Sequence, residues 1–173
     1  MKKEAWDSSD QKANELTLSM FGTPEDVREK AKMPKRASNY SEAKDILNSL
    51  INKPLVSMGG LVAFISKNSA KELLSGAAVG NSYEKQAHLI AVANIDKLFS
   101  NAVEPWNFDL NPVKSNEGLK AIRRLYSPML YKDRIVPVKL TVKEIKNDNE
   151  GNRLYSLKAI DVDLEKNNEV QVT

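Results

Sequence analysis

The clearest pattern of hydrophobic and polar positions lies near the C-terminus, where residues 134–146 alternate between the two classes. Such alternation predicts a half-buried β-strand, because successive strand side chains face opposite sides. The polar stretch 147–152 then predicts a turn, and residues 153–164 predict a second strand paired with the first. One side of the first strand carries the apolar residues Val136, Val138, Leu140 and Val142, and the other carries Lys139, Thr141 and Lys143.

The register of this hairpin follows from matching its apolar rows. They align if Leu157 lies opposite Val142 and Ala159 lies opposite Leu140. The other side then becomes a compact polar surface that suits phosphate without any metal ion. We expect this surface to contain Lys139, Thr141, Lys143, Ser156 and Lys158. The alternative interpretation is an ordinary solvated sheet face.

The first half of the chain has the spacing of short helices. Capping and proline signals predict helices over residues 8–21, 23–33 and 41–50. Further along, the pattern predicts a strand at 61–65, a helix from Ser66 to Gly76, a longer helix at 82–100, a polar loop after Trp106, and a strand at 122–131 broken by Pro128. Helices followed by antiparallel strands predict an α+β fold, with N-terminal helices packed on one face of a small twisted antiparallel sheet.

Composition narrows the classes of protein. A chain of 173 residues with 41% hydrophobic and 28% charged residues predicts about one globular domain with a real core. The net charge of +3 neither demands nor excludes a nucleic-acid partner, because a local patch matters more than the total. No apolar run approaches the ~18 residues of a membrane span, and the start of the chain does not read as a secretory signal.

Two residue counts limit the chemistry further: cysteine is absent and histidine occurs once. This excludes zinc sites of the Cys/His type, cysteine nucleophiles and histidine pairs. Asp161 and Asp163 share a strand face without further ligands nearby, so we expect no metal site and no cofactor. His88 falls in the apolar stripe of the predicted helix 82–100. It is either a core histidine satisfied by a backbone carbonyl or a general acid or base.

Several blocks of sequence follow one another in an order that resembles a known family. They are NKPLVS (52–57), FIS (64–66), ELLSG (72–76), AHLIAVAN (87–94), VPVKLTVKE (136–144) and NRLYSL (152–157). This order resembles the large polyvalent protein-associated domains of phages and mobile elements. Those domains look related to the barnase/EndoU/colicin/RelE-like ribonucleases, which include toxins of contact-dependent inhibition systems.

The resemblance covers about residues 52–164 and implies metal-independent RNA cleavage by attack of the RNA's own 2′-OH on phosphate. It implies three parts: a helical N-terminal extension at 1–51, a ribonuclease-like α+β domain at 52–166 and a tail at 167–173. Within the matched blocks, the residues that it implies as catalytic are His88, Lys139, Thr141 and Tyr155.

RNA cleavage needs a base for the 2′-OH, cations at the phosphate and an acid for the departing oxygen. His88 is the one side chain whose unperturbed pKa suits proton transfer near neutrality. Tyr155 lies on the apolar side in the expected register, so a packed aromatic is its alternative role. The residues expected to bind RNA are Lys143, Ser156, Lys158, Arg123 and Arg124. Adjacent strand residues face opposite sides, so at most one of the two arginines reaches a given site.

Two functions of different classes remain at this point. The first is a ribonuclease toxin domain that attacks RNA, tRNA being one candidate, in the cytoplasm after delivery from a larger polypeptide. Such a toxin implies a cognate immunity protein as a second partner. The second is a non-catalytic module of a phage-type polyvalent protein that binds a protein or a nucleic acid.

Overall fold

The computed structural model describes residues 24–82, 84–104, 111–115, 118–147 and 153–162. Its helices are α2 (Pro24–Ala31), α3 (Tyr40–Asn48), α4 (Lys67–Leu73), α5 (Gly76–Asn81), α6 (Lys85–Ala93) and α7 (Ile95–Ser100). Its strands are β1 (Leu55–Val56), β2 (Val62–Phe64), β3 (Asn111–Ser115), β4 (Gly118–Tyr131), β5 (Arg134–Asn147) and β6 (Arg153–Val162). The α+β prediction is confirmed, while the helix predicted at 8–21 lies outside the described residues.

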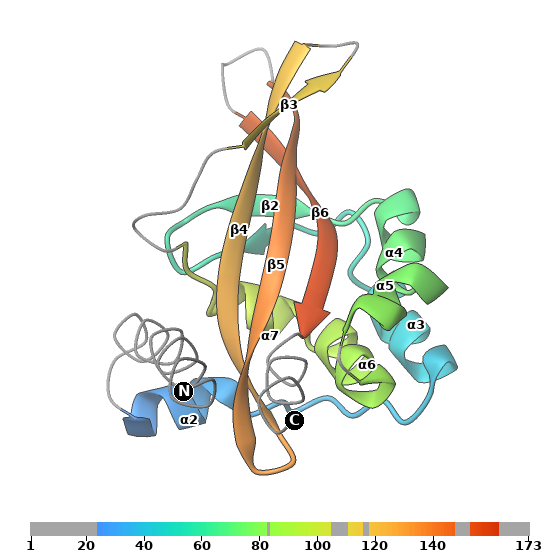
Figure 1. Cartoon of the computed structure of the whole chain (residues 1–173), viewed down its shortest axis with the longest axis vertical. Coiled ribbons are helices and arrows are strands. Elements are labelled where there is room, and N and C mark those ends of the chain that lie inside the picture. Colours follow the sequence, from blue (N-terminus) through green and yellow to red (C-terminus); the bar gives the residue numbers. More distant parts are fainter. Residues whose placement is uncertain (1–23, 83, 105–110, 116–117, 148–152, 163–173) are drawn as a thin grey trace, which may run out of the picture.

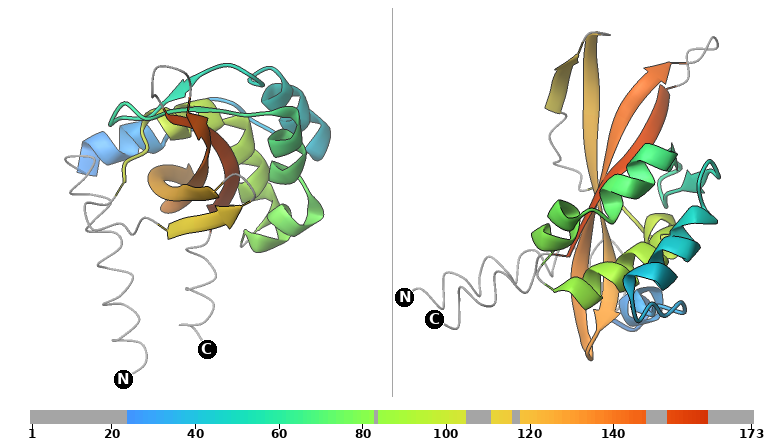
Figure 2. Two further views of the ribbon diagram at one scale, coloured as in Figure 1. Left: turned by 90° about the horizontal axis from the view of Figure 1, so that it is seen from above. Right: turned by 90° about the vertical axis from the view of Figure 1, so that its right-hand side faces the viewer.

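All the described strands form one sheet in the order β1-β2-β6-β5-β4-β3. The pairs are antiparallel except for β2 with β6, which are parallel. The expected twisted antiparallel sheet is thus extended by one parallel pair, because β2 reaches β6 from a distant part of the chain rather than through a hairpin. Figure 1 shows the long strands β4, β5 and β6 at the centre, with α3 to α6 grouped beside β6. Seen from above in Figure 2, these strands curl strongly.

Serine caps divide the helical segment between β2 and α6. The predicted cap is confirmed: Ser66 Oγ accepts a hydrogen bond from Ser69 N–H at the start of α4. The predicted end at Gly76 is wrong, because Gly76 begins α5 instead. The side chain of Ser75 accepts from the Ala78 N–H and caps this second helix. A serine directly before the glycine was the signal that the sequence offered.

The helix predicted at 82–100 is also wrong as a single element, since it breaks at Asn94 into α6 and α7. Asn94 follows the last residue of α6, and its side chain is buried. Its Oδ1 accepts from the Lys35 N–H at 2.9 Å, and its Nδ2 donates to the Lys35 carbonyl at 2.7 Å. A contact 59 residues away in the chain therefore decides where α6 ends.

Two strand predictions also need correction. The segment Asn111–Ser115, expected to be a polar loop, forms β3 against the start of β4. Pro128 does not break β4, because it lies opposite Pro137 of β5. Neither proline has an N–H to donate, so the two fit together at a non-hydrogen-bonded pair of the ladder without loss of a bond.

The β5–β6 register is confirmed in one half and wrong in the other. Leu157 lies opposite Val142, as predicted. Ala159 does not lie opposite Leu140, because a register shift leaves Lys158 without a partner and pairs Leu140 with Ile160. Leu157 and Ile160 of β6 are three residues apart, although their partners Val142 and Leu140 are two apart. The unpaired Lys158 makes up the difference, so that Ile160 rather than Ala159 enters the core.

The apolar side of β5 is the predicted core side, since Val136, Val138, Leu140 and Val142 are at most 1% exposed. They belong to one hydrophobic cluster with residues of α3, α4, α6 and α7. Leu47 of α3 is fully buried in this cluster. The helices thus pack against the apolar side of the sheet and against β6. The polar side of the strands β4 and β5 is considered next as a site.

Candidate nucleic-acid interface

Strands β4 and β5 pair with each other, and the polar side of this pair carries cationic side chains from both strands. Directly paired residues share a face, so the pairing of Thr141 with Arg124 places these two together, and likewise that of Lys139 with Tyr126. Lys143 lies on the same side two residues along. We call Arg124, Lys139, Thr141 and Lys143 the basic face. The prediction that Lys139, Thr141 and Lys143 share one side is confirmed by the register.

The basic face carries three cations and one nearby carboxylate. Lys139 Nζ lies 3.9 Å from Asp161 Oδ2 of β6, and their side chains are 28% and 20% exposed. Arg124, Thr141 and Lys143 are also partly exposed. The long distance and the partial exposure make this ion pair weak. The face therefore has a net positive charge that remains accessible to solvent.

Two residues expected on this surface differ from its other members. Ser156 lies opposite Lys143, as predicted, but is only 4% exposed. Its hydroxyl hydrogen-bonds the Ser69 hydroxyl of α4 at 3.0 Å, so the helix covers it. Lys158 is the unpaired residue of the bulge, where simple alternation no longer fixes the side to which a residue points. The expected accessible position of Ser156 is therefore wrong.

Arg123 lies on the other side of β4, opposite Val142. Its guanidinium donates to both carboxylate oxygens of Glu104, and Nη1 lies 3.4 Å from the Tyr155 hydroxyl. The guanidinium carbon is 5.5 Å from the centre of the Tyr155 ring. Burial acts to lower the pKa of Arg123, but the hydrogen bonds with Glu104 and Tyr155 outweigh it and raise the pKa. Only Arg124 of the two arginines thus reaches the basic face, as alternation predicted.

A cavity of about 540 Å³ opens beside this cluster. Glu104 and Arg123 line one part of it, and the loop 57–61 lines another. Tyr155 itself is 4% exposed and packs on the apolar side with Leu157, in agreement with its alternative role. Glu104 was missed in the sequence, where nothing in its local pattern marks it. It is brought to Arg123 by the bridge between Val103 and Tyr126.

His88 is fully buried, and both of its ring nitrogens have partners. Nε2 lies 2.7 Å from the Leu73 carbonyl, which only accepts, so Nε2 carries the proton. Nδ1 lies 2.7 Å from Ser82 Oγ and accepts from that hydroxyl. The same oxygen accepts from the Val162 N–H of β6 at 3.1 Å. This chain of bonds describes a neutral histidine of the core type.

The electrostatics of His88 agree with this geometry. Burial lowers its pKa, while the hydrogen bond to Leu73 and the negative charge of Asp161 act in the opposite direction. Asp161 is also the carboxylate near Lys139, so one side chain of β6 lies between His88 and the basic face. A substrate atom has no free ring nitrogen to contact here. The catalytic role of His88 stays a prediction. Its role in the core is supported by the hydrogen bonds with Leu73 and Ser82.

The described residues contain no group of three or more His, Cys, Asp or Glu side chains that would suit a metal ion. Asp163, considered with Asp161, lies outside the described residues. Within the same part of the chain, no helix has the length and apolar character needed to cross a membrane.

A family model described as large polyvalent protein-associated domain 3 matches residues 34–155. This range takes in α3 to α7 and every strand as far as the start of β6, including the basic face and the Glu104 cavity. No curated protein and no solved structure matches the chain significantly.

Proposed function

The chain belongs to the large polyvalent protein-associated domain 3 family, and from this premise we propose that it binds RNA through the basic face. One observation carries the proposal: two strands contribute Arg124, Lys139 and Lys143 to the same side of the hairpin. The domain would act in the setting of phages and mobile elements that the sequence resemblance implies.

The chemistry of the basic face suits a phosphate backbone. Arg124 offers a planar fork that can hold one phosphate with two hydrogen bonds, while the lysines act as point charges. Thr141 lies between the lysines and supplies a neutral hydroxyl donor. Tyr126, paired with Lys139, offers a ring on the same side for stacking a base. Contacts of this kind bind single strands with little dependence on sequence.

The test is the salt dependence of RNA binding. Binding of a labelled single-stranded RNA is measured by fluorescence anisotropy at several salt concentrations. Lys139→Gln, Lys143→Gln and Arg124→Gln should each weaken binding and reduce the slope against log salt by roughly 0.7, because each removes about one phosphate contact. Lys44→Gln, at an exposed position of α3, is the matched control and should leave the slope unchanged. Equal slopes for all the variants would contradict the proposal.

Metal-independent RNA cleavage is the second candidate, favoured by the contact between Arg123 and Tyr155 beside Glu104. The Glu104 carboxylate and the Arg123 guanidinium line one cavity, and the guanidinium contacts the buried Tyr155 phenol behind them. Together they offer a proton acceptor, a cation for the phosphate and a proton donor. His88 and Lys139 remain the alternative set that the family resemblance implies. A toxin of this kind would act in the cytoplasm and require a cognate immunity protein.

Incubating the protein with total RNA in chelator separates binding from cleavage. If the Glu104 cluster cleaves RNA, Tyr155→Phe and Glu104→Gln should each abolish fragments on a denaturing gel, whereas His88→Gln should retain them. Loss of cleavage in a folded His88→Gln variant would instead assign the proton transfer to His88. Intact RNA with the wild-type protein would exclude cleavage and leave binding as the proposed activity.

A further inference from the structure

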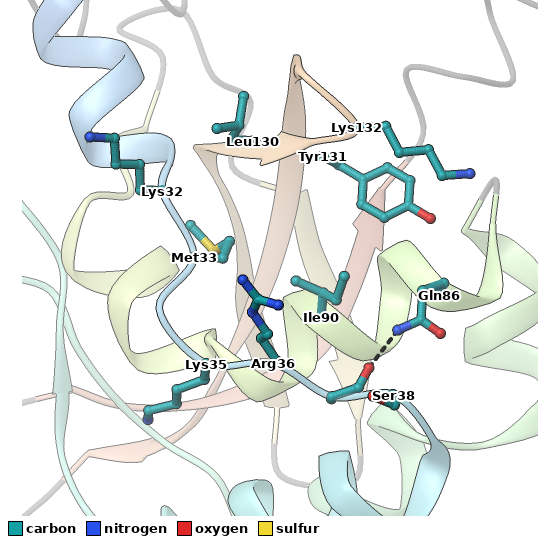
Figure 3. Close-up of a pocket in the computed structure, with 11 residues that line it drawn as sticks. Lys32, Met33, Lys35, Arg36, Ser38, Gln86, Ile90, Leu130, Tyr131 and Lys132 are labelled. Atoms are coloured by element: carbon teal, nitrogen blue, oxygen red, sulfur yellow. Dashed lines mark hydrogen bonds between the residues drawn. The ribbon is translucent and has the colours of Figure 1, made fainter.

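A second cavity, of about 480 Å³, lies away from both sets of residues described above. Figure 3 shows it between the connection from α2 to α3, helix α6 and the turn end of β4. Its size falls within the range of about 300–1,000 Å³ typical of small-molecule sites. The connection supplies one wall, Gln86 and Ile90 of α6 supply the floor, and residues 130–132 supply the opposite wall.

The lining of this cavity is cationic and contains no carboxylate. The cationic residues are Lys32, Lys35, Arg36 and Lys132. Lys35 and Lys132 bind Asp96 and Glu84, which lie outside the lining. Arg36 differs, since no carboxylate in the described part of the chain pairs with it. In Figure 3 its guanidinium extends from the connection toward Met33 and Ile90.

The wall that carries Arg36 is fixed by hydrogen bonds on both sides of it. Asn94 binds both the N–H and the carbonyl of Lys35. Gln86 Nε2 donates to the Ala37 carbonyl, as Figure 3 shows. A connection without secondary structure is thus held against α6 at the residues flanking Arg36. Such a preformed site loses less conformational entropy when a ligand binds.

The cavity also has apolar side chains, contributed by all three of its walls. Met33, Ile90 and Leu130 present partly buried side chains, and the Tyr131 ring lies beside them. Tyr131 donates its hydroxyl to Glu84 Oε1 at 2.8 Å, which keeps the ring in place. Lys132 Nζ lies 5.3 Å from the centre of the same ring. The cavity therefore offers an apolar surface next to an unpaired arginine.

We infer that this cavity binds a phosphorylated nucleoside, with the phosphate at Arg36 and the base against Met33, Ile90 and Leu130. The arginine fork matches a phosphate, and the apolar side chains match the flat face of a base. The ligand has two sources with the same chemistry: a free mononucleotide, or the 5′-phosphorylated end of an RNA. The inference does not depend on RNA binding by the basic face, because the two sets share no residue.

The test uses calorimetric titration of the full chain with adenosine, guanosine, cytidine and uridine 5′-monophosphates. We expect saturable binding of at least one of them below about 1 mM, and weaker binding of the corresponding nucleoside. Arg36→Gln should weaken the binding about tenfold or more, because it removes a charge-assisted contact. Arg28→Gln removes the same charge from an exposed position of α2 outside the cavity and should change the affinity less than twofold.

The remaining arms assign the source and can overturn the inference. Displacement of the nucleotide by a short 5′-phosphorylated RNA, but not by its 5′-hydroxyl form, would identify an RNA end; no displacement would identify a free nucleotide. The Lys139→Gln/Lys143→Gln double variant should keep nucleotide binding whether or not it loses RNA binding. Absence of binding to all four nucleotides, equal binding by Arg36→Gln, or preference for an acidic peptide over a nucleotide would each overturn the inference.

Discussion

His88 connects more of the fold than any catalytic role would require. From α6 it donates to Leu73 at the end of α4, and it accepts from Ser82 just after α5. Ser82 in turn accepts from Val162 of β6. Four elements thus meet through one imidazole ring, and the bond in which Nδ1 accepts from the Ser82 hydroxyl requires the neutral form. Protonation would leave two facing donors at Nδ1 unless the serine reoriented, so the network opposes the charged state.

This arrangement predicts a specific dependence of stability on pH. The pKa of His88 is lowered in the folded state from an ordinary value of 6.5. The unfolded chain therefore binds the proton more readily, and this part of the stability is present above pH ~6.5 and lost as the pH falls through the range below it. Urea unfolding of the wild type should show this loss between pH 7.5 and 5.5, and His88→Gln should show less of it.

The same variant also separates a structural role from a catalytic one. His88→Gln should cost about 1–3 kcal/mol at pH 7.5, because Ser82 loses its acceptor in a buried site. Lys85→Gln, exposed on the same helix, is the control and should stay within about 0.5 kcal/mol of the wild type. An unchanged pH dependence in His88→Gln would show that the histidine does not titrate with unfolding.

At the scale of elements, contacts between distant segments decide where helix α6 ends and where strand β6 contains a bulge. Asn94 ends α6 because it binds the backbone of Lys35, and the bulge at Lys158 sets which residues of β6 enter the core. In both places the local pattern favours a more regular element. The free energy gained by pairing buried polar groups, or by burying a larger apolar side chain, outweighs that preference.

The break at Asn94 gives one prediction. Asn94→Ala improves the helix propensity of the segment but leaves the Lys35 N–H and carbonyl without their partners. The substitution should therefore destabilise the protein by about 2–4 kcal/mol in urea unfolding. Asn48→Ala, at the exposed last residue of α3, should change the stability by less than about 1 kcal/mol. Equal effects at the two positions would mean that the Asn94 contact contributes little.

The bulge in β6 gives a second prediction for the strands, which concerns Ala159 and Ile160. Ile160 lies opposite Leu140 and is 1% exposed, whereas Ala159 lies opposite Thr141 and is partly exposed. Ile160→Ala should therefore cost about 2–5 kcal/mol, and Ala159→Ser about 0.5 kcal/mol or less. A regular strand would reverse this order, because Ala159 would then face the core. Thermal unfolding of the two variants distinguishes the registers.

At the scale of the whole molecule, the N-terminal helices differ in how they join the core. Leu47 and Ala43 of α3 are fully buried in the main hydrophobic cluster with β5 and β6. The buried residues of α2, Val27 and Ala31, lie outside that cluster. The family match begins at residue 34, between the two helices. The hydrophobic core therefore includes residues that precede residue 52, the position at which the sequence resemblance begins.

Truncation tests this difference. A chain starting at residue 34 lacks α2 but keeps α3 and the Asn94–Lys35 contact, so we expect it to unfold cooperatively at a lower temperature than the full chain. A chain starting at residue 52 lacks Leu47, Ala43 and the partner of Asn94, so we expect it not to fold. Circular dichroism during heating checks both. Cooperative unfolding of the shorter chain would show that the domain begins at residue 52.

The sequence by itself determined the elements whose signals are local. Alternation over residues 134–146 fixed which side of β5 enters the core, and Ser66 marked the start of α4. It also predicted that at most one of Arg123 and Arg124 joins the basic face. These features follow from the two-residue period of a strand and from a cap three residues away, so a short window contains their cause.

Tertiary structure alone decided the features whose partners are distant in the chain. The burial of Ser156 depends on Ser69 of α4, and the association of Arg123 with Glu104 depends on the bridge at Val103. The position of His88 in an apolar stripe left two roles open, and its contacts with Leu73 and Ser82 appear only when α4, α5 and α6 pack together. A buried polar group must find its partner wherever the fold brings one, and no local pattern contains that information.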